Sequence, residues 1–138
     1  MFYLILGETP VQNKISLLNI SNYTYVGEIR SAIYKNNEKK DTFNRIVENN
    51  LKLWQVDGID EDKERMLDER PHGINIKEDL NGEELFPRDK IPDKLKDDSI
   101  YIHIIVELPT GKCFPMVYLS NKNFVTITNL FYFLLLSL

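Results

Sequence analysis

The residue types that most often perform acid–base chemistry are sparse in this 138-residue chain. Its two histidines are His72, in the turn-type sequence Pro-His-Gly, and His103, in a run of aliphatic residues. No serine, cysteine or carboxylate spacing joins the two histidines into a catalytic triad or a zinc-protease motif. Neither histidine is therefore predicted to be catalytic, and we expect no enzyme activity.

Two other segments have residue types that bind phosphate or calcium. Gly111-Lys112 has the order that ends a phosphate-binding loop, but Val106 stands where that loop needs its first glycine. The acidic run from Asp57 to Glu64 offers oxygen ligands, yet its turn glycine and bidentate glutamate are not at EF-hand spacing. Because a charge run is usually a solvated surface, the sequence predicts neither a cofactor nor a metal site.

The composition is typical of one soluble domain. The chain is 43% hydrophobic and 28% charged, with a formal net charge of -4, which disfavours binding to nucleic-acid phosphates. Binding to an anionic membrane surface is disfavoured for the same reason. The single cysteine excludes a disulfide framework and any cysteine-based zinc site.

The charge is unevenly distributed along the chain. From Cys113 to Leu138 the only charged side chain is Lys122, so we expect a domain at residues 1–109 and an apolar tail at 110–138 that is not a domain. The apolar stretch Phe124 to Leu138 has 15 residues, fewer than the roughly 20 that span a bilayer. A truncated gene model that reads into non-coding sequence therefore explains the tail better than a membrane anchor does.

The first third of the chain reads as a hairpin followed by a helix. Apolar and β-prone residues fill Phe2 to Gly7 and Lys14 to Ile20, separated by turn-type residues. The N-terminus has no basic region and too short an apolar run for a conventional signal peptide. A helix is expected next, with Thr24 available as its cap. Its apolar positions are Val26, Ile29 and Ile33.

The remaining elements are two strands and two irregular segments. Leu51 to Asp57 is predicted as a strand, and the charged stretch Asp57 to Arg70 as a mobile solvated loop or an exposed helical turn. Residues 79–95 are expected to form an irregular connection. Ser99 to Pro109 is the longest β-branched run and is apolar on both faces, which is typical of a central strand. Its predicted alternation places Ile100, Ile102, Ile104 and Val106 on one face.

This order of elements is that of the ubiquitin-like β-grasp, an α+β fold with a mixed sheet, one main helix and the last strand beside the first. Val26-Gly-Glu-Ile-Arg-Ser-Ala-Ile is similar to the start of the ubiquitin-like helix. Asn81-Gly-Glu-Glu-Leu, followed by Ile91, is similar to the turn before its final strand. No terminal Gly-Gly follows that strand, so conjugation through a C-terminal glycine is not expected.

Two motifs stand out, Leu51-Lys-Leu-Trp-Gln-Val-Asp near the middle of the predicted domain and His103-Ile-Ile-Val-Glu-Leu-Pro at its end. Together they resemble the Crinkler effectors. In that family a ubiquitin-like N-terminal region has a middle motif, in fungal members often Leu-x-Leu-Trp-Lys-Val-Asp, and closes with His-Val-Leu-Val-x-x-Pro. Gln55 departs from the middle motif, and aliphatic replacements stand at Ile104 and Ile105. The matching positions are Leu51, Leu53, Trp54, Val56, Asp57, His103, Val106 and Pro109. Trp54 can be read either as a core aromatic or as an exposed recognition anchor.

The resemblance implies a non-enzymatic N-terminal delivery or trafficking module of a secreted effector that acts in host cells, exported without a recognisable signal peptide. Its partners would be host or trafficking proteins, contacted around Leu51 to Asp57, while a separate C-terminal domain, not recognisable here, acts in the host. The alternative is an intracellular ubiquitin-like interaction domain that regulates a partner through its sheet face. Secretion distinguishes the two. The sequence indicates no oligomeric state.

Overall fold

The computed structural model describes residues 1–97 and 100–109, which form an α+β fold with a five-stranded mixed sheet and three α-helices. The strands are β1 (Phe2–Ile5), β2 (Ser16–Leu17), β3 (Lys52–Gln55), β4 (Glu83–Leu85) and β5 (Ile102–Glu107). The helices are α1 (Val26–Asn37), α2 (Glu61–Glu69) and α3 (Ile76–Asp79). The predicted tail at 110–138 lies outside the described residues.

The strands lie in the order β2-β1-β5-β3-β4, so β5 is the central strand. It runs parallel to β1 and antiparallel to β3. The predicted N-terminal hairpin is confirmed, because β1 and β2 pair antiparallel. The central position predicted for the last strand is also confirmed, and Ile104, Ile105 and Val106 are fully buried in it.

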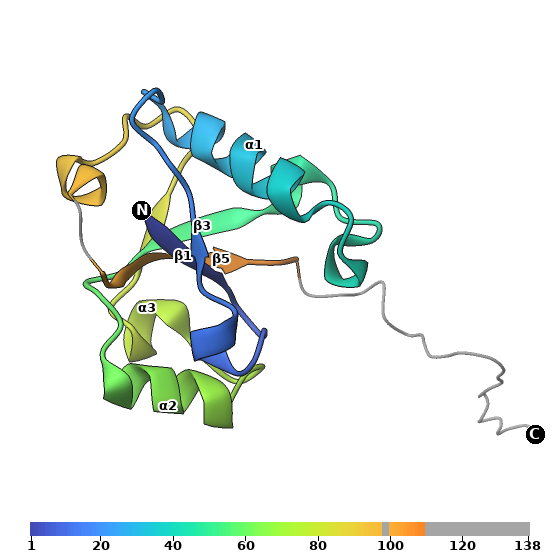
Figure 1. The fold of residues 1–138 in the computed structure, drawn as a ribbon, viewed down its shortest axis with the longest axis vertical. Coiled ribbons are helices and arrows are strands. Elements are labelled where there is room, and N and C mark those ends of the chain that lie inside the picture. The colour runs from blue at the N-terminus through green and yellow to red at the C-terminus, as the bar shows by residue number, and fades with distance from the viewer. Residues whose placement is uncertain (98–99, 110–138) are drawn as a thin grey trace, which may run out of the picture.

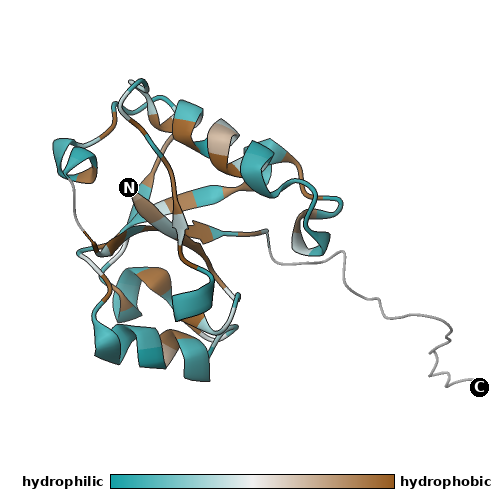
Figure 2. Cartoon of the chain, in the orientation of Figure 1, coloured by the Kyte–Doolittle hydropathy of each residue, from teal (hydrophilic) through white to brown (hydrophobic). Residues whose placement is uncertain are grey.

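Helices cover both faces of the sheet (Figure 1). On one face α1 contributes Ile29 and Ile33 to a core shared with the strands. On the other face α2 contributes Leu67 and α3 contributes Ile76 to a second core. Figure 2 shows hydrophobic residues interspersed with hydrophilic ones along these helices, as expected for helices that bury one side against a sheet. We call the two clusters the α1-side core and the α2-side core.

A bulge in β5 decides which core each of its side chains enters. Phe2 pairs with Ile102 but Tyr3 pairs with Ile104, so His103 is an extra residue in β5. As a result Ile102 lies in the α2-side core and Ile104 in the α1-side core. The predicted alternation is therefore wrong at its start, and Ile100, which is 82% exposed, lies outside the strand.

The charged stretch Asp57 to Arg70 was predicted as either a solvated loop or an exposed helical turn. The structure has the helix α2 there. The Asp60 side chain caps α2 by accepting a hydrogen bond from the Lys63 N–H, at 2.9 Å. Leu67 is the one residue of α2 that is fully buried. A second carboxylate, Asp68, accepts from the Val11 N–H at 2.9 Å and ties α2 to the turn before β2.

The start of α1 and the segment 79–95 also differ from the prediction. The N-cap of α1 is Tyr25, not Thr24, and the Glu28 carboxylate accepts hydrogen bonds from the backbone N–H groups of both residues. Segment 79–95 is not entirely irregular, because it contains β4. Gly82 is required just before β4, since a Cβ there would lie 2.6 Å from a methyl carbon of Ile76.

Candidate functional site

The two sequence motifs are neighbouring strands in the folded chain. β3 pairs antiparallel with β5, so that Leu53 lies opposite Val106 and Trp54 opposite Ile105. The Val56 N–H continues this ladder by donating a hydrogen bond to the His103 carbonyl oxygen, at 2.9 Å. Segments far apart in the sequence therefore form one structural unit at the centre of the sheet.

Most apolar motif side chains are used to build the two cores. Leu51, Leu53 and Val106 are buried in the α1-side core. Val56 is buried in the α2-side core. Because burying such side chains is a main source of folding free energy, these positions stabilise the domain and are not accessible to a partner.

Trp54 was predicted to be either a core aromatic or an exposed recognition anchor, and it has features of both. Its ring is half-buried and packs against the α2-side core. Its Nε1–H donates a hydrogen bond to Glu107 Oε1 at 2.8 Å, which links β3 to β5 a second time, through side chains. Trp54 is therefore chiefly a structural residue of the β3–β5 pair.

The polar motif residues lie at the ends of the pair. Asp57 is exposed and accepts a hydrogen bond from Lys94 Nζ at 2.9 Å, and this bond together with the lysine charge lowers the pKa of the Asp57 carboxyl. His103 is half-buried, with its Nδ1 at 3.5 Å from the Val56 carbonyl oxygen, a weak contact. Pro109 follows the end of β5 and is partly exposed.

The described residues bring together no catalytic set that the sequence missed. His72 lies exposed in a turn before α3, whereas His103 lies on β5. Within residues 1–97 and 100–109 no group of three or more histidine, cysteine, aspartate or glutamate side chains could hold a metal ion. In the same part of the chain no helix has the length and apolar character needed to cross a membrane.

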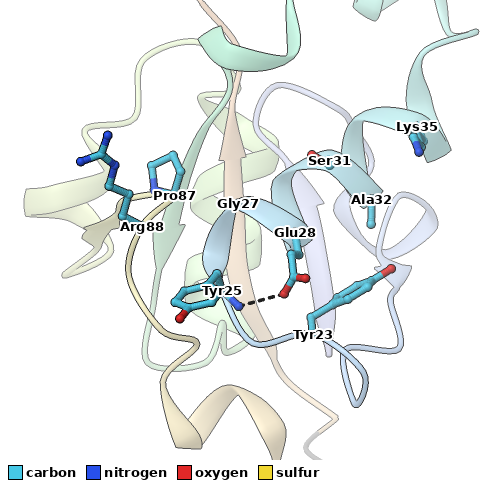
Figure 3. Close-up of a pocket in the computed structure, with 9 residues that line it drawn as sticks. All are labelled: Tyr23, Tyr25, Gly27, Glu28, Ser31, Ala32, Lys35, Pro87 and Arg88. Carbon is cyan, nitrogen blue, oxygen red and sulfur yellow. Dashed lines mark hydrogen bonds between the residues drawn. The ribbon is translucent and has the colours of Figure 1, made fainter.

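Two surface hollows lie on either side of the first turn of α1. The larger, about 750 Å³, is shown in Figure 3 and is called here the helix-start groove. Its lining residues are Tyr23, Tyr25, Gly27, Glu28, Ser31, Ala32, Lys35, Pro87 and Arg88. The smaller, about 500 Å³, lies where the two motif strands end and is called the motif-end groove. Its lining residues are Val26, Arg30, Asn49, Asn50, Leu51, Lys52, Leu53, Glu84, Leu85, Phe86, Pro87, Glu107, Leu108 and Pro109.

The acidic group of the helix-start groove is occupied in holding the helix. In Figure 3 the Glu28 carboxylate lies between the rings of Tyr23 and Tyr25, and Pro87 lies across the groove. Glu28 Oε1 accepts from the Thr24 N–H at 2.6 Å and from the Tyr25 N–H at 3.0 Å. These two bonds lower the pKa of Glu28, because they favour its ionised form. Glu28 thus stabilises the start of α1 from within the larger hollow.

The motif-end groove is the hollow that contacts the two motifs. Leu51 and Leu53 of the middle motif and Pro109 of the closing motif line it. The hollow was not predictable from local spacing, because its walls come from α1, the 48–50 turn, β3, the end of β4 and the end of β5. The sequence signal closest to it is the pair of motifs itself.

Comparison with protein families decides what kind of domain this is. Residues 1–107 match the model of the Crinkler effector protein N-terminal domain. The chain belongs to this family. The match includes every strand and helix described above, and it confirms the resemblance inferred from the two motifs. Searches of curated proteins and of solved structures gave no match.

Family membership sets the context for the geometry. The Crinkler N-terminal domain is an effector domain and is not a known catalytic domain. The β3–β5 pair contains Lys52 to Gln55 of the middle motif and His103 to Glu107 of the closing motif, whose last two residues, Leu108 and Pro109, lie just beyond the match. The main role of the family motifs in this chain is therefore to form two paired strands of the sheet.

Proposed function

We propose that this Crinkler N-terminal domain is a non-enzymatic delivery or trafficking module of a secreted effector that acts in host cells. The observation that carries the proposal is the family match over residues 1–107, which coincides with one folded unit whose two motifs are adjacent strands. The module works by binding host or trafficking proteins. Nucleic acid is not among its partners, because the net charge is -4.

We infer that the fold is a ubiquitin-like β-grasp. The strand order β2-β1-β5-β3-β4, with β5 parallel to β1, supports this inference. The position of α1 across one face of the sheet supports it further (Figure 1). In this variant α2 and α3 pack on the opposite face.

The burial of the motifs limits how the module can be recognised. A partner cannot contact Leu53 or Val106 without unfolding the sheet, since both are buried. Recognition must use the exposed residues of the motifs, such as Lys52 and Asp57 of the middle motif. We therefore assign the buried motif positions to stability and the exposed ones to binding.

The competing function is an intracellular ubiquitin-like domain that regulates a partner through its sheet face. The two cores argue against this mode of binding, because α1 covers one face of the described sheet and α2 with α3 covers the other. An open sheet face of the kind such an interaction needs is not present in the described residues.

A translocation assay tests the proposal. The full chain is fused at its C-terminus to a reporter enzyme that is active only in host cytoplasm, and is expressed in the producing cell during contact with host cells. We expect reporter activity inside the host and the protein in the surrounding medium. Retention of a folded, soluble fusion inside the producing cell would contradict delivery and favour the regulatory function.

Matched variants separate recognition from folding in the same assay. Asp57→Asn combined with Lys52→Gln changes only exposed side chains near the motifs and is expected to reduce delivery while the circular dichroism spectrum is unchanged. Glu38→Gln, an exposed change next to the end of α1, serves as the surface control and should leave delivery unchanged.

A further inference from the structure

The motif-end groove contains a cation whose hydrogen-bonding capacity is largely unused. Arg30 extends from α1 and is half-buried. Its Nη2 donates to Asn49 Oδ1 at 3.1 Å, whereas its Nε is shielded from solvent and has no hydrogen-bond partner. Among the described residues Arg30 forms no ion pair.

Arginine in this state favours one kind of ligand group. A guanidinium has five N–H donors in a fixed plane and no acceptor, and leaving a buried donor unpaired is unfavourable. A carboxylate satisfies the guanidinium best, because its two oxygens match the spacing of adjacent N–H groups. The two acidic residues that line the groove do not fill this role, since Glu107 accepts from Trp54 and Glu84 forms no ion pair within the described chain.

The walls around Arg30 combine polar and apolar side chains. Leu85 and Leu108 are partly buried and offer accessible apolar surface, beside the charged Lys52, Glu84 and Glu107. Phe86 also lines the groove, and 55% of its surface is exposed, so its ring is accessible to a partner. A volume of about 500 Å³ is enough for a few side chains of an extended peptide.

We propose that the motif-end groove binds an extended peptide segment of a partner protein in which an acidic side chain is flanked by apolar side chains. The carboxylate of the segment pairs with Arg30, and the apolar neighbours pack against Phe86 and Leu108. A basic segment is disfavoured, because it would bring a further cation to a groove whose Arg30 and Lys52 form no ion pair within the described residues. This binding does not depend on the proposed delivery of the domain into host cells.

Peptide titration of the full, isotope-labelled chain tests this binding by nuclear magnetic resonance. The probes are three acetylated peptides, Gly-Ser-Leu-Glu-Leu-Val-Ser-Gly and the same peptide with Gln or Lys in place of Glu. We expect saturable shifts of the Arg30 Nε–H and Phe86 amide signals with the Glu peptide. The Gln peptide should bind about ten-fold more weakly, which corresponds to about 1.4 kcal/mol, and the Lys peptide should bind no better than the Gln peptide.

Variants assign the effect to the groove. Arg30→Gln should remove the preference for Glu over Gln, and Arg30→Lys, which keeps the charge, should retain part of it. Phe86→Ala should weaken both peptides to a similar extent. Lys35→Gln on the same helix, in the helix-start groove, is the control and should change nothing.

Several results would overturn the proposal. They are equal binding of the Glu and Gln peptides, an unchanged preference in a folded Arg30→Gln variant, shifts confined to the helix-start groove, or no shift with any peptide at millimolar concentration. Because the titration is performed on purified protein, failure here leaves the translocation result unaffected, and failure of translocation leaves the titration unaffected.

Discussion

Replacement of Leu53 by alanine measures how far the middle motif serves the fold. Leu53 is 1% exposed, lies in the α1-side core and stands opposite Val106 on one side and Leu85 on the other. Truncation of a leucine in such a core costs about 2–5 kcal/mol, from lost burial and from the cavity that remains. Because neighbouring strands hold the position on both sides, little collapse is possible, and we expect a loss of about 3–4 kcal/mol.

The assay is urea unfolding followed by fluorescence of Trp54, the single tryptophan of the chain. With a urea dependence of about 1–3 kcal/mol per molar for a small domain, the Leu53→Ala midpoint should fall by about 1–4 M. The matched control is Lys52→Ala on the same strand, which is exposed and should change stability by no more than about 0.5 kcal/mol. If both folded variants unfold at the same midpoint as the parent, Leu53 is not a core residue and the structural role of the motif is refuted.

Three further sets of changes test the central strand, the tryptophan and the helix cap. Ile102→Asp and Ile104→Asp should each abolish folding by circular dichroism, because each places an unpaired carboxylate in one of the two cores. Trp54→Phe should destabilise by about 1–2 kcal/mol in thermal unfolding, and by much less where Glu107 is already alanine, because both changes remove the same hydrogen bond. Glu28→Gln should lower the melting temperature at neutral pH. Since folding lowers the pKa of Glu28, its contribution is present above the ordinary glutamate pKa of about 4.3 and is lost as the pH falls through the lowered value.

Each of these predictions has an opposite outcome. Native-like melting of either isoleucine variant would show that its side chain does not point into a core. Additive effects of the Trp54 and Glu107 changes would show that the two side chains do not interact. A difference between Glu28→Gln and the parent that does not shrink as the pH is lowered below the ordinary glutamate pKa would show that Glu28 does not act through its charge.

The elements with a clear period were predictable from the sequence. The hairpin, α1 and the central strand each have enough apolar or β-branched residues to specify them. The two motifs also identified the family that the comparison confirms. α2 was missed in part because only Leu67 of its nine residues is fully buried, so that its charged composition concealed its helical period.

Features set by tertiary contacts were not predictable. The bulge at His103 leaves no trace in a strand that is apolar on both faces, because a shift of one residue exchanges one buried isoleucine for another. β4 has three residues, and two of them are glutamates, which do not favour a strand. Its extended conformation therefore depends on its pairing with β3. Arg30 becomes a candidate binding residue only when the end of β5 is brought beside α1.

The pairing of the two motifs is tested most directly by a nuclear Overhauser effect between the Hα atoms of Leu53 and Val106 in the full chain. The Val56 N–H to His103 carbonyl bond makes 53 and 106 a non-hydrogen-bonded pair, in which the Cα atoms lie about 4.5 Å apart and the Hα atoms face each other. We predict a strong effect between these two atoms. If this effect is absent, or if the Hα of Leu53 shows an effect to the Hα of a residue outside β5, the pairing of the two motifs as neighbouring strands is contradicted.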